Sequence, residues 1–377
     1  MEPMASPAAA VGRVLIVGPK PPPYGGMAIQ AQALVARLRQ DGADADFLAT
    51  NPEVFRWLGQ LKGIRTVIQS LLYLTNLAGD LARSQVVHLL GASHWYFILR
   101  VIPTVVLAKL FRRRIILNYR GGEAPEFFAR FPRLIKPILR LVDVIAVPSA
   151  YLQRLFHAYG YHATIIPNFV DLGRFRFRQR DLIKPNLLLT RSLEPLYNIP
   201  MALRAFAYIK QQYPEARLDV VGSGSEETTL KSWVRQQGLS GVYFHGAVRN
   251  EEIAKFLDNA DILLNPTNAD NMPNNLMEAF AAGVPVVTTN VGGIPDLVGK
   301  EEAALMVDAD DAAAMARCVY ELLHRPQLVA RLTLQASKLC EQMTWESVGR
   351  QWVEMYRVNG EATVSKSKSQ VDLPTPR

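Results

Sequence analysis

The sequence predicts an α/β protein with two consecutive domains, each built around its own mainly parallel sheet. The chain has 377 residues, too many for one ordinary hydrophobic core, so two domains of roughly 150 to 200 residues are expected. Continuous aliphatic runs alternate with segments of helical spacing, a pattern typical of parallel sheets covered by helices. The runs form two series on either side of a polar, basic stretch at residues 168–185, which we take as the linker.

The first series opens with the aliphatic run RVLIVG at residues 13–18. The loop PKPPPYGGM follows it, and AIQAQALVARLRQ then places apolar residues three and four positions apart. A strand, a glycine-containing loop and a helix in this order begin a doubly wound unit. Further strands are expected at QVVHLL (85–90), RIILNY (114–119), VIAVPS (144–149) and ATIIPN (163–168).

The second series repeats this arrangement in the C-terminal half of the chain. Its strands are expected at NLLLTR (186–191), RLDVVGSG (217–224), VYFHGAV (242–248), DILLNP (261–266) and VPVVTT (284–289). Residues 343–360 then show the spacing of an amphipathic helix, and a tail rich in Ser, Lys, Thr and Pro is expected to be disordered over 361–377. We therefore predict an N-terminal domain at 1–170 and a C-terminal domain at 171–342.

Composition restricts the class of protein. A hydrophobic content of 49% with 20% charged residues describes a globular chain. The two cysteines, Cys318 and Cys340, lack the spacing of a disulfide framework or a zinc site, which favours a reducing compartment. The N-terminus has no basic segment followed by an apolar run, so no signal peptide is expected. No stretch approaches the roughly 20 apolar residues that a membrane span needs.

The net charge of +8 is unevenly distributed along the chain. Residues 1–175 carry 20 Lys and Arg against 10 Asp and Glu, whereas the remainder carries 22 against 24. This excess favours an anionic partner for the N-terminal half: nucleic acid, a phospholipid surface or a phosphorylated substrate. No nucleic-acid-binding motif accompanies it. Basic segments rich in Trp, Leu and Ile at 54–74 and 94–114 favour contact with an anionic membrane over helices that only pack on the sheet.

Ligands of doubly wound sheets bind at the carboxyl ends of the strands, so the loops there carry the candidate site. In PPPYGGM, Gly25 and Gly26 allow a phosphate to approach the backbone, although two glycines also form a simple turn. Arg191 directly follows a strand and can clamp a phosphate, or it is an ordinary surface residue. Gly222 and Gly224 provide either a third phosphate loop or a tight turn before a capped helix.

The most informative stretch is NADNMPNNLMEAFAAGVPVVTTNVGGIPD at residues 268–296. A helix capped by Asn274 or Asn275 should begin there, with Asp270 in the loop before it and Glu278 in its first turns. The helix amides suit a phosphate or a polar sugar edge, while the two carboxylates accept hydrogen bonds from hydroxyl groups. A nucleotide sugar has both kinds of group. Two solvated surface acids are the alternative.

This stretch resembles the E-x7-E region of family 4 glycosyltransferases, retaining enzymes of the GT-B fold, with Asp270 and Glu278 as the two acids. The segments PYGGM, IIPNFVDLGRF, RSLEP, VVGSGSEETTLKSWVRQQGLSGVYFHGAV and TWESVGRQWVEMY resemble further parts of the same family in the same order. The resemblance covers roughly residues 12–358. It implies two Rossmann-like domains that face a cleft, with the last helix crossing back to the N-terminal domain.

The resemblance also implies roles for single residues. Glu278 would bind the ribose of the donor, Asp270 the transferred sugar and Arg191 the diphosphate, while the backbone near Val248 would bracket the base. Gly26 and its neighbour would approach the diphosphate from the other domain. The donor-binding residues implied are Gly25, Gly26, Arg191, Asn198, Val248, Asp270, Asn274, Asn275, Leu276 and Glu278.

Three positions depart from the family's pattern. Asp270 is one methylene shorter than the usual Glu, Tyr197 stands where a Lys is usual, and Arg120 stands where a His is common. We expect Arg120 to supply the charge that Tyr197 cannot, so the expected catalytic residues are Asp270, Arg191 and Arg120. The expected acceptor-binding residues are His88, Arg120 and Glu123. His88 is equally compatible with a hydrogen-bonded position in the core.

The residues and the resemblance together predict a retaining hexosyltransferase that moves a sugar from a UDP or GDP sugar to a glycan or polyprenyl-linked acceptor. The pathway expected is bacterial surface-polysaccharide biosynthesis, and the place is the cytoplasm, on the cytoplasmic face of the inner membrane. The resemblance implies that no metal or cofactor is needed, and cationic and amide groups would stabilise the leaving phosphate. The alternative is a non-catalytic nucleotide-sugar-binding subunit. The base, the sugar, the linkage and the oligomeric state are left open.

Overall fold

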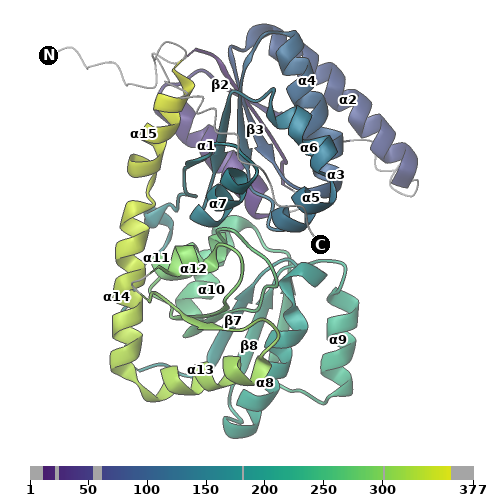
Figure 1. Cartoon of the computed structure of the whole chain (residues 1–377). Helices are drawn as coiled ribbons and strands as arrows, with labels where there is room; N and C mark the ends of the chain where they lie inside the picture. Colours follow the sequence, from purple (N-terminus) through teal and green to yellow (C-terminus); the bar gives the residue numbers. More distant parts are fainter. Residues whose placement is uncertain (1–11, 22–24, 54–61, 181, 300–301, 358–377) are drawn as a thin grey trace, which may run out of the picture.

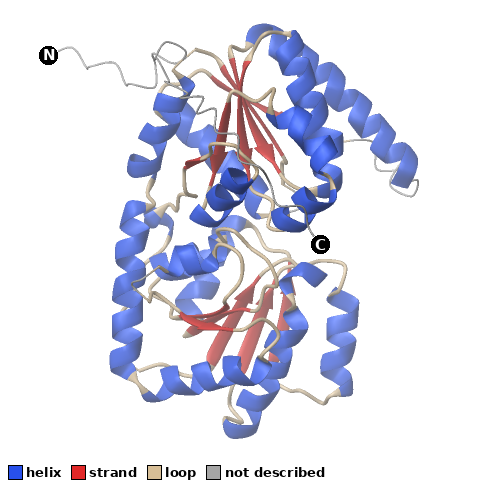
Figure 2. Cartoon of the chain, in the orientation of Figure 1, coloured by secondary structure: helices blue, strands red, loops and turns tan. Residues whose placement is uncertain are grey.

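The computed structural model describes residues 12–21, 25–53, 62–180, 182–299 and 302–357. The described chain forms two domains, one above the other in Figure 1, with a helical C-terminal arm that runs along both. Each domain contains a six-stranded sheet in which all neighbouring strands are parallel. In Figure 2 the strands of each sheet lie among covering helices. The predicted fold class, two Rossmann-like domains with a helix crossing back, is confirmed.

The N-terminal sheet has the strand order β2-β1-β3-β4-β5-β6. Its strands are β1 (Val14–Gly18), β2 (Ala45–Ala49), β3 (Val86–Gly91), β4 (Arg114–Tyr119), β5 (Val144–Val147) and β6 (Thr164–Ile165). The helices around it are α1 (Gly26–Gln40), α2 (Lys62–Arg83), α3 (His94–Tyr96), α4 (Ile102–Leu110), α5 (Ala124–Arg130), α6 (Pro132–Leu139) and α7 (Ala150–Ala158). A π-helical stretch, Phe97–Val101, joins α3 to α4.

Continuous apolar runs form these strands because both faces of the sheet are covered. Every residue of β1 and β3 is buried. Leu15 and Val17 of β1 belong to a core shared with α2 and α4, whereas Val14 and Ile16 belong to a core shared with α1 and the last helix. The alternating side chains of one strand therefore supply two layers, as a strand in the middle of a doubly wound sheet must.

The C-terminal sheet has the order β12-β11-β10-β7-β8-β9. Its strands are β7 (Asn186–Thr190), β8 (Arg217–Val221), β9 (Val242–Gly246), β10 (Ile262–Asn265), β11 (Val286–Thr289) and β12 (Leu305–Val307). Its helices are α8 (Ile199–Gln212), α9 (Glu227–Gln236), α10 (Ile253–Asn259), α11 (Asn274–Ala281), α12 (Ile294–Val298) and α13 (Ala312–His324).

The C-terminal arm connects the two domains and consists of α14 (Pro326–Gln342) and α15 (Trp345–Tyr356). α14 packs against α11 of the C-terminal domain, and α15 packs on the N-terminal sheet through Trp345, Trp352 and Tyr356. The indole Nε1 of Trp345 also donates a hydrogen bond to the Asp41 carboxylate at 2.8 Å. The arm therefore holds the domains together on the side away from α2 (Figure 1).

Two strands escape sequence-based prediction. β2 has the sequence ADFLA and β12 has only three residues, so neither forms a continuous aliphatic run. The tail at 361–377 and the first part of the basic segment at 54–74 lie outside the described residues. In the part of the chain that the structure describes, no helix combines the length and the apolar character needed to span a membrane.

Candidate active site

Loops from both domains enclose two adjoining cavities at the domain boundary. The larger, about 460 Å³, is lined mainly by the C-terminal domain and includes Val248, Asn275 and Glu278. The smaller, about 280 Å³, lies against the N-terminal domain and includes Arg120 and Asp270. Four residues line both cavities: Gly26, Arg191, Tyr197 and Asn274. The site is therefore divided into two compartments that share one wall.

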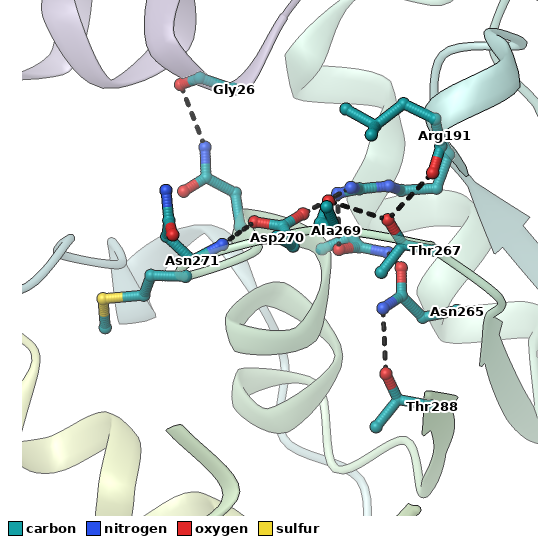
Figure 3. Close-up of polar contacts among 12 residues, drawn as sticks. Gly26, Arg191, Asn265, Thr267, Ala269, Asp270, Asn271 and Thr288 are labelled. Carbon is teal, nitrogen blue, oxygen red and sulfur yellow. Dashed lines mark hydrogen bonds and ion pairs between the residues drawn. The ribbon is translucent and has the colours of Figure 1, made fainter. Parts of the chain in front are cut away.

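Arg191 stands where the two compartments meet. It follows β7, and its guanidinium forms an ion pair with Asp270 and donates a hydrogen bond to Asn275 Oδ1 at 3.3 Å (Figure 3). The same guanidinium lies over the Tyr197 ring, 3.9 Å from its centroid. Its Nε is buried and has no hydrogen-bond partner among the described residues. A buried donor without a partner inside a cavity is the kind of group that a phosphate oxygen can satisfy.

The loop between β10 and α11 is held in place by hydrogen bonds to the neighbouring strand β11. Asn265 at the end of β10 donates to Thr288 Oγ1 at 2.9 Å, and Thr289 Oγ1 donates to the Thr267 carbonyl at 2.6 Å. Gly292 packs on this loop with φ +56°, and an added Cβ would lie 2.0 Å from the Asp270 carbonyl oxygen. Only glycine fits there. The pair of glycines in the sequence therefore serves to position Asp270.

The expected caps of α11 are not formed. Asn274 is the first helical residue, Pro273 occupies the cap position, and no side chain caps the helix. The Asn274 side chain instead joins the domains: it donates to the Gly26 carbonyl at 3.1 Å and accepts hydrogen bonds from Gln30 and Asn168. Because no side chain satisfies the first amides of α11, they remain available to a polar ligand.

Glu278 lies one turn into α11 and lines the larger cavity. Burial raises the pKa of its carboxyl group to about 7, and Arg174 opposes this shift only in part. The carboxylate has no hydrogen-bond partner in the described part of the chain. A half-buried acceptor of this kind suits paired hydroxyl groups such as those of a ribose.

Only some of the other expected donor-binding residues line the two cavities. Val248 lines the larger cavity, whereas the Leu276 side chain is fully buried, so only its backbone could meet a ligand. Gly25 precedes α1 and Gly26 begins it. Asn198 adopts a left-handed conformation and donates to Asn268 Oδ1 at 3.0 Å, and it lines neither cavity.

Two of the three expected acceptor-binding residues line the smaller cavity. Arg120 follows β4, and Glu123 stands at the start of α5, 3.5 Å from His94 Nε2. His94 itself, with φ +57°, was not expected in the site, and only its place after a strand end could have indicated it. In the described ranges, no group of His, Cys, Asp and Glu side chains is suited to hold a metal.

His88 lies away from the cleft. Its side chain is fully buried, its Nδ1 lies 2.6 Å from the Tyr356 hydroxyl, and Asn118 Nδ2 donates to its Nε2 at 3.1 Å. The ring also contacts Trp352 of α15. Burial, and then the nearby charge of Arg120, lower the pKa of His88 to about 3. His88 therefore fixes α15 to the sheet, as the alternative interpretation of this histidine anticipated, and it has no surface for an acceptor.

Comparisons with known proteins find sequence relatives of part of the chain and solved structures that share its fold. Residues 184–325 match the family described as Glycosyl transferases group 1. The D-inositol 3-phosphate glycosyltransferase of Streptomyces scabiei is 27% identical over 259 residues, 62% of this chain and 58% of that protein. The amylovoran biosynthesis glycosyltransferase AmsK of Erwinia amylovora is 30% identical over 223 residues, 56% of this chain and 52% of that protein. The chain thus spans less than two thirds of these curated relatives.

The structural comparison covers nearly the whole chain. Anabaena Alr3699/HepE, solved in complex with UDP and glucose, superposes with a TM-score of 0.72 over 91% of this chain and 99% of that one, at 16% identity. The chain therefore has the GT-B fold, and its C-terminal domain carries the match to Glycosyl transferases group 1.

Proposed function

We propose that this protein is a retaining glycosyltransferase that moves a sugar from a nucleotide sugar to a glycan or lipid-linked acceptor. The observation that carries the proposal is the position of Arg191, whose guanidinium lies between the two cavities and has an unsatisfied Nε. A diphosphate at this point would place a nucleoside in the larger cavity and a sugar in the smaller one. The match of residues 184–325 supports the same interpretation.

The donor is bound by the C-terminal domain. Glu278 accepts hydrogen bonds from the ribose, and the backbone near Val248 brackets the base. Of the two bases expected, uracil is favoured, because the structural neighbour HepE was solved with UDP. The amides at the start of α11 meet the phosphate or the sugar edge. Gly26, which lines both cavities, approaches the diphosphate from the N-terminal domain.

Catalysis begins with an exchange of partners at Arg191. The diphosphate takes the place of Asp270 on the guanidinium, and Asp270 is then free to accept hydrogen bonds from hydroxyls of the transferred sugar. When the bond between sugar and phosphate breaks, Arg191 and the amides of α11 stabilise the charge on the leaving diphosphate. The acceptor hydroxyl attacks from the same face and passes its proton to that diphosphate. Because the acceptor attacks the face from which the diphosphate departs, the configuration is retained without a protein nucleophile or a covalent intermediate.

The acceptor belongs to surface-polysaccharide biosynthesis, a proposal supported by the relative named for amylovoran biosynthesis. Peripheral contact with an anionic membrane, on its cytoplasmic face, fits the exposed apolar stripe of α2: Ile64, Val67 and Leu71 are 51%, 59% and 58% exposed. Exposed Arg112 follows α4, the helix that packs against α2, and exposed Arg130 lies on α5 of the same domain. Sedimentation with phosphatidylglycerol vesicles at low salt tests this contact, and Val67→Glu should weaken it.

A donor screen tests the function. Purified protein is titrated with UDP, GDP and ADP sugars, reading thermal stabilisation and slow release of the nucleoside diphosphate, alongside Glu278→Ala. Stabilisation by one donor that the variant loses, together with slow release, is expected. Binding without release, even with membrane extract as a source of acceptor, would instead identify a non-catalytic nucleotide-sugar-binding subunit.

A further inference from the structure

The smaller cavity is lined by one cationic side chain, Arg120, that no other described side chain contacts through a hydrogen bond or an ion pair. Its charged lining residues are His94, Arg120, Glu123, Arg191 and Asp270. Arg191 is paired with Asp270, and His94 lies 3.5 Å from Glu123. The Arg120 guanidinium makes no hydrogen bond or ion pair with any residue that the structure describes. Arg120 is therefore the cation of this cavity whose guanidinium has no partner among the described residues.

The backbone fixes the base of this side chain from both domains. The Arg120 N–H donates to the Gly91 carbonyl at 2.8 Å, and its carbonyl accepts a hydrogen bond from Asn271 Nδ2 at 2.9 Å. Gly121 follows, packed so tightly that an added Cβ would lie 2.5 Å from Ser93 Oγ. Arg120 is therefore held at the domain boundary by a turn with little freedom.

Arg180 provides a comparison, because it is a buried arginine whose guanidinium is hydrogen-bonded within the protein. Burial lowers the pKa of both Arg120 and Arg180 to about 10. The Arg180 guanidinium, however, donates to the carbonyls of Ala260, Ala282 and Gly283. Arg120 has no such acceptors, and no carboxylate opposes the shift of its pKa. Arg120 is half-buried and lines the smaller cavity, so an anion brought by a ligand can supply the partner that the protein does not.

The diphosphate proposed above would lie at Arg191 rather than at Arg120. Arg191 lines both cavities, whereas Arg120 lines only the smaller one, on the side of the N-terminal domain. We propose that Arg120 selects an acceptor that carries a negatively charged group, a phosphate or a carboxylate, close to the hydroxyl that receives the sugar. The inference rests on the proposed function, because it assigns this cavity to the acceptor and the transferred sugar.

The size of the cavity limits what the anion is attached to. About 280 Å³ is near the lower end of ligand pockets, which span roughly 300–1,000 Å³. Because the transferred sugar takes part of this volume, there is room beside it for the anionic group of the acceptor and the adjoining hydroxyl, and the remainder of the acceptor would lie outside. This assignment develops the acceptor-binding role expected for Arg120 from the sequence and replaces the second expected role, in which Arg120 neutralises the donor diphosphate. The two roles predict different effects of replacing Arg120. A diphosphate role predicts a loss of nucleotide affinity, whereas an acceptor role predicts that nucleotide affinity is kept.

Calorimetry on the full chain distinguishes between these two roles of Arg120. Protein saturated with UDP is titrated with glucose 1-phosphate, glucuronate and uncharged glucose. The variants are Arg120→Gln, which removes the charge, and Arg120→Lys, which keeps the charge but not the planar fork. Arg133→Gln, an exposed arginine of α6 outside both cavities, is the matched control. Thermal midpoints confirm that each variant is folded.

We expect one charged probe to bind about tenfold or more tightly than glucose, because a hydrogen-bonded ion pair is stronger than a neutral contact. Arg120→Gln should remove this preference, Arg120→Lys should keep part of it, and Arg133→Gln should keep it all. The UDP affinity should change less than about twofold in every variant. The charged probe that binds more tightly identifies the anion as a phosphate or a carboxylate.

Three results would overturn the inference. Equal affinity for charged and uncharged probes in UDP-loaded wild-type protein would show that the cavity takes no anion. A loss of UDP affinity in Arg120→Gln would assign the residue to the donor diphosphate. A preference for UDP-glucuronate over UDP-glucose that depends on Arg120 would place the anion on the donor sugar. Failure of both UDP and GDP to bind wild-type protein would, in contrast, overturn the proposed function itself.

Discussion

Replacing Glu278 by Gln should stabilise the protein at alkaline pH and weaken donor binding at the same time. Burial raises the pKa of Glu278 from 4.5 to about 7 in the folded chain. Between these two values the folded state binds a proton that the unfolded state releases, so the free energy of unfolding decreases as the pH rises. The stability linked to this group is therefore fully present below pH 4.5 and lost above pH 7.

The size of the effect follows from the shift. At about 1.36 kcal/mol per pKa unit, a change from 4.5 to about 7 corresponds to about 3 kcal/mol at pH 8. Glutamine has nearly the same shape and does not ionise, so Glu278→Gln should recover about 2–3 kcal/mol at pH 8 and little at pH 5. The same variant loses the charged acceptor for the ribose, which should weaken UDP binding about tenfold or more.

Urea unfolding followed by circular dichroism at pH 5 and pH 8 measures the first effect, and calorimetry with UDP measures the second. Glu354→Gln, at an exposed position on α15, is the control and should change neither quantity. In wild-type protein the UDP affinity should also rise with pH up to about 7 and then level off. A stability difference between Glu278→Gln and wild type that does not depend on pH would refute the reasoning, because it would mean that Glu278 does not titrate as a buried group.

Three further substitutions test other parts of the site. Arg191→Lys keeps a charge but loses the planar fork, so UDP affinity in calorimetry should fall about tenfold, and unchanged affinity would contradict the diphosphate role. Gly292→Ala would place a Cβ 2.0 Å from the Asp270 carbonyl, so sugar transfer should be lost while circular dichroism shows a folded protein. Tyr356→Phe leaves His88 Nδ1 without its partner in the core, so urea unfolding should show a loss of about 1–3 kcal/mol with UDP binding unchanged. A Tyr356→Phe variant as stable as wild type would argue against a structural role for this pair.

The sequence predicts the architecture well because each buried parallel strand is encoded by a short aliphatic run of its own residues. An aliphatic run such as RVLIVG has few other stable conformations when both of its faces are covered. β2, which contains Asp46, and the short β12 lack such a run, and only pairing with an existing neighbour makes them strands. Propensity alone cannot detect a strand that depends on tertiary pairing.

The sequence predicts which residues belong to the site, but it does not predict which side chains they contact. Arg191 and Asp270 were both expected there, yet their ion pair joins positions 79 residues apart, and no local pattern encodes it. For the same reason the sequence left two positions open for the His88 side chain, the cleft and the core. Its environment is determined by Tyr356 of α15, 268 residues later in the chain. Sequence patterns show which strand end a side chain follows. They do not show which distant helix covers it.

The shared wall of the two cavities explains why the donor and acceptor sides should influence each other. Asn274 begins α11, whose first amides are proposed to meet the donor, and its side chain is hydrogen-bonded to Gly26, Gln30 and Asn168 of the N-terminal half. Asn271, one loop residue after Asp270, holds the carbonyl of Arg120. A shift of α11 when a diphosphate takes Arg191 from Asp270 would therefore move both the loop at Gly26 and the turn at Arg120. Donor binding and the anion preference of the smaller cavity should be coupled for this reason, and calorimetry with and without UDP would measure that coupling directly.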